Sequence, residues 1–208
     1  SFAEKRGYLP KGHDILSGVE KVKDIGGEIE IFTPKELANL FEHVREEMTP
    51  YLAIAAFAGL RKAELERLDW SEINLEEGFI VVTAAKAKTA SRRLVPLTDN
   101  LYEWLIPYKR SSGMVVPFAN VSKQLSQVLA NDSGIKWKRN GLRHSYISFR
   151  LAKVKNVNQV AFEAGNSPSM IFKHYRELVT ERQSTAWFSI VPPEQEKVLN
   201  SAECKVAA

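Results

Sequence analysis

The segment TPYLAIAAFAGL, Thr49 to Leu60, decides the fold. From Tyr51 onward it is apolar on every side, and an α-helix without a polar face is buried in a folded domain. Thr49 and Pro50 carry the start signal of a helix, and Gly59 ends or bends it. We therefore predict a central, buried helix around which the other elements pack.

A second helix is predicted on the N-terminal side of this segment. Thr33, Pro34 and Glu36 form a capping box with proline at the first helical position. The apolar residues that follow recur at the spacing of one helix face, namely Leu37, Leu40, Phe41 and Val44.

The pattern changes to β-strands on the C-terminal side. Ile73 to Leu75 and Phe79 to Thr83 flank a turn at Glu76-Glu77-Gly78, and Arg93 to Pro96 returns after a basic loop. These segments predict a small antiparallel sheet of about three strands.

The rest of the chain is predicted to be helical. Thr98 begins a helix with Leu101, Trp104 and Leu105 on its apolar face, and Val121, Leu125, Val128 and Leu129 mark another that Gly134 terminates. Further helices are expected at residues 142–153, 157–164, 167 to about 179, and 180–190. The predicted fold class is mainly α with a small antiparallel β-sheet (α+β).

A chain of 208 residues with 44% hydrophobic content supports one globular domain with tails. We assign residues 1–30 to a linker or arm, 31–192 to the folded domain, and 193–208 to a polar tail. The longest apolar run, residues 51–60, is too short to cross a bilayer, and no secretory signal is evident. The single cysteine, Cys204, forms no intramolecular disulfide, which fits a reducing compartment.

The distribution of positive charge is more informative than the net charge of +4. Residues 86–93 contain four cations and no acid, and residues 136–139 contain three cations. A solvated charged face usually mixes signs, so these runs favour contact with phosphates over simple solvation.

Several common chemistries are absent from the sequence. It has no GxxxxGK, HExxH, paired CxxC or GxSxG motif. Four histidines and one cysteine make a structural zinc site a poor fit. We therefore expect no metal and no cofactor.

Two arginines and one tyrosine remain as candidate functional residues. Arg61 and Arg143 each follow a Gly-Leu pair, and Tyr175 ends the segment AGNSPSMIFKHY. Each has an ordinary alternative: Arg61 can pair with Glu64 or Glu66, Arg143 can be an exposed helical residue, and Tyr175 can place its ring in the core with its hydroxyl in water.

Four segments in order resemble the catalytic domain of the tyrosine recombinase (phage integrase) family. They are the first arginine box AGLRKAEL (58–65), the hairpin-lysine segment KTASRRLVPL (88–97), NGLRHS (140–145) and AGNSPSMIFKHY (164–175), whose tyrosine comes ten residues after the glycine. The resemblance covers roughly residues 32–191, and it implies that residues 1–30 are the linker from a missing N-terminal DNA-binding domain. It implies site-specific cleavage and rejoining of DNA through a 3′-phosphotyrosyl intermediate, without a metal.

The resemblance also implies a role for each residue. Tyr175 would attack the scissile phosphate, while Arg61 and Arg143 would bind its non-bridging oxygens. Lys88 would protonate the leaving 5′-oxygen, with Lys86 as the competing candidate.

Two positions depart from the family pattern. Asn140 and Asn166 stand where the family usually has histidine, or for the second position histidine or tryptophan. Asparagine can donate a hydrogen bond to phosphate but cannot take the proton of the tyrosine. His144 and His174 are conceivable replacements, although we expect His144 to be a packed structural residue. The alternative function is a catalytically weakened, DNA-binding accessory protein.

The implied partner is double-stranded DNA. The expected location is the cytoplasm, for a protein of bacterial, prophage or viral origin. Self-association into a tetrameric synapse is expected through the C-terminal helix, whose Trp187, Phe188 and Ile190 dock on a neighbour or else pack on their own domain. The residues expected to contact DNA are Lys86, Arg92, Arg93, Lys138, Arg139 and Lys173.

Overall fold

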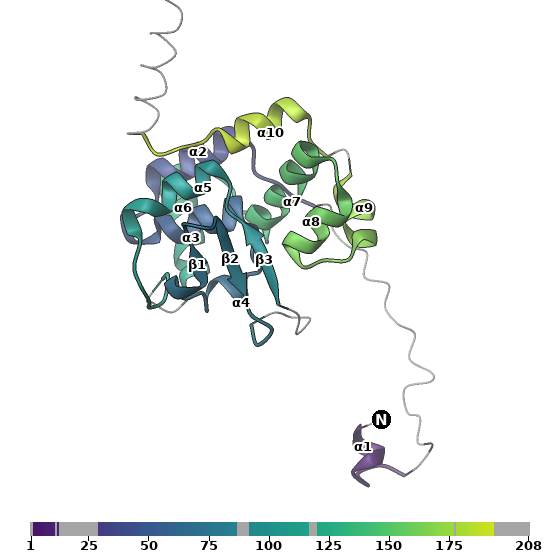
Figure 1. Ribbon diagram of the computed structural model, residues 1–208. Coiled ribbons are helices and arrows are strands. Elements are labelled where there is room, and N and C mark those ends of the chain that lie inside the picture. Colours follow the sequence, from purple (N-terminus) through teal and green to yellow (C-terminus); the bar gives the residue numbers. More distant parts are fainter. Residues whose placement is uncertain are drawn as a thin grey trace, which may run out of the picture.

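The computed structural model describes residues 2–10, 12, 29–86, 92–116, 120–176 and 178–193, and it is mainly helical with one small sheet (Figure 1). The helices in chain order are α1 (Phe2–Lys5), α2 (Pro34–His43), α3 (Thr49–Phe57), α4 (Lys62–Leu65), α5 (Asp99–Leu105), α6 (Val121–Ser133), α7 (Gly141–Val154), α8 (Val157–Ala164), α9 (Pro168–Tyr175) and α10 (Glu181–Phe188). Short 3₁₀ turns lie at Glu46–Met48, Trp70–Glu72 and Ile106–Tyr108.

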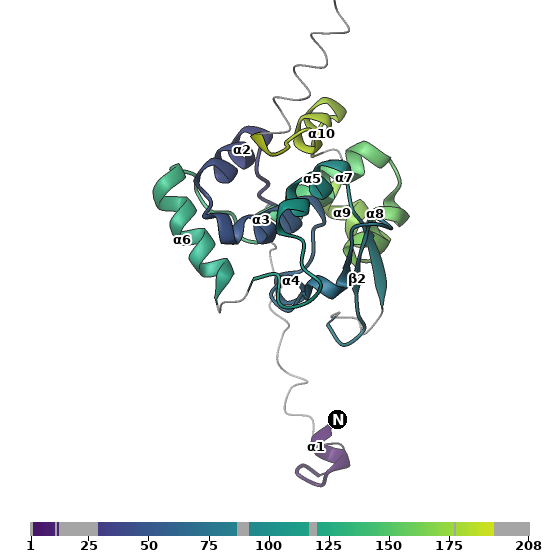
Figure 2. The same ribbon diagram turned by 60° about the vertical axis from the view of Figure 1, so that its left-hand side comes forward.

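Helix α3 is the centre of the fold, as its sequence predicts. Every one of its residues is buried. It packs against α5 on one side and α7 on another, and Figure 2 shows α6 and the pair α8 and α9 on opposite sides of it. The capping box before α2 is also confirmed, because Thr33 Oγ1 accepts from the Glu36 N–H at 3.1 Å and Glu36 Oε2 accepts from the Thr33 N–H at 2.7 Å.

The predicted sheet is confirmed, with strands β1 (Ile73–Asn74), β2 (Phe79–Val82) and β3 (Arg93–Pro96) in the order β1-β2-β3, all antiparallel. Val82 lies opposite Arg93 and Ile80 lies opposite Val95. Because side chains alternate along a strand, Arg93 and Val95 point inward while Leu94 points to solvent. This alternation decides the position of Arg93 in the site described below.

The last four helices follow the predicted order, but α9 is shorter than expected. The sequence predicts a helix to about residue 179, whereas α9 ends at Tyr175 because Arg176 has an extended backbone (φ −66°, ψ 133°). The turn that follows leads to α10, which Thr180 caps through its bond with the Gln183 N–H. Helix α8 packs against β3, and the helices α7, α8 and α9 pack against one another as a group, the α7–α9 group. Tyr175 is the final residue of α9.

The aromatic side chains of α10 pack on their own domain. Trp187 is fully buried, donates its indole N–H to the Ala56 carbonyl at 3.2 Å and stacks on Phe149 at 4.4 Å between ring centroids. Phe188 is 8% exposed. Of the two alternatives that the sequence leaves open for these two rings, the structure shows packing on their own domain: α10 lies across α7 and buries them there.

Within the described parts of the chain, no helix combines the length and the apolar composition that a membrane crossing needs. The division into an arm, a folded domain and a tail stays a prediction.

Candidate active site

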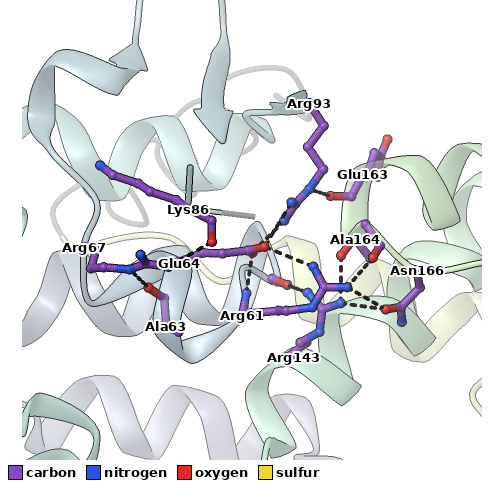
Figure 3. A network of polar contacts seen from close by, with 12 residues as sticks. Arg61, Ala63, Glu64, Arg67, Lys86, Arg93, Arg143, Glu163, Ala164 and Asn166 are labelled. Atoms are coloured by element: carbon purple, nitrogen blue, oxygen red, sulfur yellow. Dashed lines mark hydrogen bonds and ion pairs between the residues drawn. The ribbon is translucent and has the colours of Figure 1, made fainter. Parts of the chain in front are cut away.

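Arg61 and Arg143 converge on one oxygen atom. Arg61 occupies the N-cap of α4, and Arg143 lies in the first turn of α7. Asn166 Oδ1 accepts from Arg61 Nη2 at 3.2 Å and from Arg143 Nη2 at 3.1 Å (Figure 3). Two arginines separated by more than eighty residues in the sequence are thus brought side by side.

Backbone carbonyls hold the same two guanidinium groups. Arg61 Nη2 donates to the carbonyl of Gly165, and Arg143 donates to the carbonyls of Gly59 and, at 2.7 Å, Ala164. The turn between α8 and α9 therefore supplies most of the acceptors. Asn166, which the sequence predicts to contact phosphate, contacts both arginines in this structure.

Gly59 explains the Gly-Leu-Arg pattern that precedes Arg61. Its φ is +59°, and an added Cβ would lie 2.2 Å from Cδ1 of Tyr146 on α7. Glycine tolerates this backbone conformation without a steric penalty. The end of α3 can therefore lie directly on the Tyr146 ring, with the Gly59 carbonyl presented to Arg143.

A buried carboxylate, that of Glu64, accepts hydrogen bonds from Arg61 and from a third arginine, Arg93. Glu64 is 2% exposed and receives Arg93 Nη1 at 3.1 Å, Arg93 Nη2 at 2.7 Å and Arg61 Nη1 at 3.0 Å. Burial raises the pKa of Glu64, but the hydrogen bonds from Arg93 and Arg61 outweigh it and hold the pKa below its ordinary value. The ion pair of Arg61 with Glu64 is thus present together with the contact to Asn166, and the two interpretations of Arg61 are compatible.

The structure corrects the expectation that Arg93 contacts DNA. Arg93 is 5% exposed, and its Nε donates to the Glu163 carbonyl at 3.0 Å while its other nitrogens hold Glu64. Arg93 thus connects β3 to α4 and α8, and each of its three guanidinium nitrogens donates a hydrogen bond within the protein. The signal was present in the sequence, because Arg93 is two residues from Val95 and must share its inward face.

The other basic residues fall into two groups. Three lysines of the basic runs are paired with acids from elsewhere in the chain: Lys86 with Glu72, Lys136 with Glu30, and Lys138 with Glu36. Lys88 lies outside the described residues. The exposed members of the predicted set are Arg92, Arg139 and Lys173.

The site carries an excess of positive charge. Three guanidinium groups, those of Arg61, Arg93 and Arg143, surround the single carboxylate of Glu64. Burial, together with the nearby Arg61, lowers the pKa of Arg143 to about 10. An anion that enters this site relieves that repulsion, so the arrangement suits a phosphate.

Tyr175 contacts His144 through its hydroxyl group. Tyr175 Oη lies 2.7 Å from His144 Nδ1, and the tyrosine is 6% exposed. Burial raises the pKa of Tyr175, and Arg143 opposes this only in part. His144 is therefore more than the packed structural residue that the sequence favours; its position next to Arg143 in the NGLRHS segment is the signal that places it at the site.

Asn140 is exposed and precedes α7 with a left-handed backbone, φ 54°. It lines a cavity of about 70 Å³ together with Arg143, Lys62 and Trp137. The structure thus places Asn140 in the same cavity lining as Arg143. The same described residues contain no group of three His, Cys, Asp or Glu side chains able to hold a metal ion.

A substitution at Gly165 tests whether the positions of the arginine side chains matter for activity. Its φ is +64°, and an added Cβ would lie 3.0 Å from Arg61 Nη1 and 3.1 Å from Arg93 Cζ. Gly165→Ala is expected to lower the free energy of unfolding by about 1–2 kcal/mol through its backbone conformation. Because the guanidinium groups must shift, it is also expected to slow the DNA cleavage that the resemblance to tyrosine recombinases implies, by about tenfold or more.

The matched control is Gly78→Ala, since Gly78 has φ +72° with nothing within 4 Å of the added Cβ. It should lose similar stability in urea denaturation and cleave as the wild type does. Equal cleavage by the two variants would show that the position of the arginines at Gly165 is not critical.

Comparisons with known proteins identify the family and the fold. The phage integrase family matches residues 30–176. A curated relative, the uncharacterized protein y4gA of Sinorhizobium fredii (strain NBRC 101917 / NGR234), is 33% identical over 82 residues, covering 34% of this chain and 43% of the relative.

Solved structures share the fold at low identity. XerA recombinase has a TM-score of 0.61 at 17% identity, with 79% of this chain and 65% of XerA covered. A lambda integrase (75–356) dimer bound to a COC′ core site has a TM-score of 0.58 at 15% identity, with 86% and 70% covered. The chain thus spans less than two thirds of the XerA chain and of y4gA. Because the family match extends over most of the chain and includes Arg61, Arg143 and Tyr175, this protein belongs to the phage integrase family.

Proposed function

We propose that this protein is a site-specific DNA recombinase that cleaves and rejoins DNA through a phosphotyrosyl bond to Tyr175. The observation that carries the proposal is the convergence of Arg61 and Arg143 on Asn166, within a site that has excess positive charge and lies next to Tyr175. A phosphodiester gains negative charge on its non-bridging oxygens during attack, and paired guanidinium groups stabilise that charge.

In the proposed reaction, the Tyr175 oxygen attacks the scissile phosphorus and the bond to the 5′-oxygen breaks. The products are a 3′-phosphotyrosyl bond and a free 5′-hydroxyl, whose proton comes from Lys88. The 5′-hydroxyl of a partner strand then reverses the step. The arginines supply the charge stabilisation, so the reaction draws on no metal or cofactor.

Double-stranded DNA is the proposed substrate and partner. Several structural neighbours are DNA complexes, among them the lambda integrase dimer on its core site and XerH recombinase on its difH substrate. Arg92, Arg139 and Lys173 are the exposed cations proposed to contact the phosphate backbone. A tetrameric synapse would have to use parts of the C-terminal region other than the buried Trp187 and Phe188.

The accessory-protein alternative rests on Asn140 and Asn166, which cannot accept a proton. We favour the enzyme because both arginines and the tyrosine are present and placed together. In a pure DNA-binding relative, no requirement would keep a tyrosine hydroxyl beside a histidine in this site.

The test is a nicked suicide substrate that carries the attachment sequence taken from the DNA flanking this protein's own gene. Release of the short nicked fragment prevents rejoining, so a covalent protein–DNA complex should accumulate, with and without a chelator. Mass spectrometry of the digested complex should place the nucleotide on Tyr175. Tight DNA binding without a covalent complex would instead support the accessory role.

A further inference from the structure

The contact between His144 and Tyr175 connects helices α7 and α9, and the two residues are 31 positions apart in the sequence. His144 lies in the first turn of α7, and Tyr175 is the last residue of α9. Their ring centroids are 5.7 Å apart and the ring planes are inclined by 34°, so the rings are tilted and not stacked. The approach is made by Nδ1 and the hydroxyl oxygen, at 2.7 Å. This is a polar contact made by the atom that the proposed reaction uses.

Other groups near the site are poor proton acceptors. Asn140 and Asn166 carry amides, and the Asn166 oxygen is already shared by the two arginines. The buried carboxylates are also engaged: Glu64 holds Arg61 and Arg93, and Glu163 holds Arg150 at 2.9 Å. Among the described residues, His144 is the base with a recorded contact to the Tyr175 hydroxyl.

The surroundings keep both partners in the protonation states that transfer requires. Burial, together with the positive charge of Arg143, lowers the pKa of His144, so its imidazole is neutral at pH 7. Burial raises the pKa of Tyr175, so its hydroxyl keeps its proton until attack. The charged group that shifts the pKa of both partners is Arg143 from α7, and the two partners contact each other directly.

We propose that His144 is a further catalytic residue, which accepts the proton of the Tyr175 hydroxyl on Nδ1 as the oxygen attacks phosphorus. The proposal rests on the recombinase function proposed above. The neutral imidazole carries its own proton on Nε2 and becomes an imidazolium, while the P–O5′ bond breaks and the 5′-oxygen is protonated separately by Lys88. In the rejoining step the imidazolium returns the proton to Tyr175. His144 thereby supplies the function that Asn140 and Asn166 lack.

The experiment separates activation of the nucleophile from protonation of the leaving group. Single-turnover formation of the covalent complex is measured on two nicked suicide substrates, one ordinary and one with sulfur in place of the bridging 5′-oxygen. Because a thiolate leaves without an acid, sulfur should restore cleavage by Lys88→Ala. His144→Gln, which retains a hydrogen-bonding amide but no base, should be slower by about 10²–10⁴-fold on both substrates.

Two controls accompany the variant. His174→Gln changes the neighbour of Tyr175 and should cleave within about threefold of wild type. The wild-type rate should rise with pH through a pKa below 6.5, as the neutral imidazole forms, and then stay level. This profile uses only the wild-type protein, so it tests the proposal even if His144→Gln does not fold.

Three results would overturn the role of His144: a wild-type rate for His144→Gln, rescue of that variant by sulfur, or a wild-type profile that stays flat over the whole acidic range in which the protein remains folded. A wild-type protein that forms no covalent complex on either substrate would remove the recombinase function itself, so the two failures are distinguishable.

Discussion

Replacing Tyr175 with phenylalanine is expected to abolish the covalent protein–DNA complex. Tyr175 provides the only hydroxyl that the proposed reaction consumes, and removal of a nucleophile from a covalent catalyst costs a factor on the order of 10⁶. The measurement is denaturing gel electrophoresis of the protein with the nicked suicide substrate. No shifted band should appear after an incubation that converts the wild type completely.

The fold and DNA binding should survive this change. The variant loses one hydrogen bond, to His144, so the free energy of unfolding should fall by about 1 kcal/mol. Tyr102→Phe is the control, because Tyr102 is 37% exposed on α5, away from the α7–α9 group, and should cleave normally. A covalent band that persists in Tyr175→Phe would show that another residue is the nucleophile.

Replacing Glu64 with alanine is expected to give a large loss of stability. Glu64 is the carboxylate partner of Arg93, whose side chain is 4% exposed, and its removal leaves that guanidinium buried without a counter-charge. Breaking a buried ion pair in this way costs about 3–5 kcal/mol, a large share of the roughly 5–15 kcal/mol that stabilises a typical domain. Urea denaturation should show the midpoint moving to much lower denaturant concentration.

Glu66→Ala is the matched control, two residues away. Its pair with Lys62 spans 3.8 Å between side chains that are 29% and 57% exposed, so its loss should change the free energy of unfolding by less than about 1 kcal/mol. Similar losses in the two variants would contradict the role of Glu64 as the central carboxylate of the arginine group.

The acid sensitivity of the wild type follows from the same residue. The pKa of Glu64 is lowered on folding, so its stabilising contribution is present above the unfolded pKa of about 4.5. It is lost as the pH falls through the lower, folded pKa. Wild-type stability should therefore fall in that acidic window, and Glu64→Ala should show a weaker dependence there.

Most of the fold could be predicted from local sequence patterns. The buried α3, the capping box of α2 and the three strands each have a signal within a few adjacent residues. The end of α9 could not, because no glycine or proline stops the helix after Tyr175. It ends where the chain turns toward the capped start of α10, whose aromatic residues are buried against α3 and α7.

The candidate site was predicted in part. The motifs identify Arg61, Arg143 and Tyr175, and the structure brings the two arginines together. The basic runs were less informative, because charges without an acid in the adjacent sequence can find one across the fold, as Lys138 does with Glu36 and Lys86 with Glu72. A run of cations in a sequence is therefore not yet an exposed patch.

The sequence alone identified the candidate residues for the chemistry and the elements that hold them, because caps, apolar periodicity and motif spacing act over a few residues. Only the tertiary structure decided what each polar group contacts. It assigned Asn166 to the arginines, Arg93 to Glu64, and His144 to the Tyr175 hydroxyl. These partners lie between 23 and 105 positions apart in the chain, and such contacts depend on how α4, β3, α7 and the α8–α9 turn pack around α3, which no local pattern specifies.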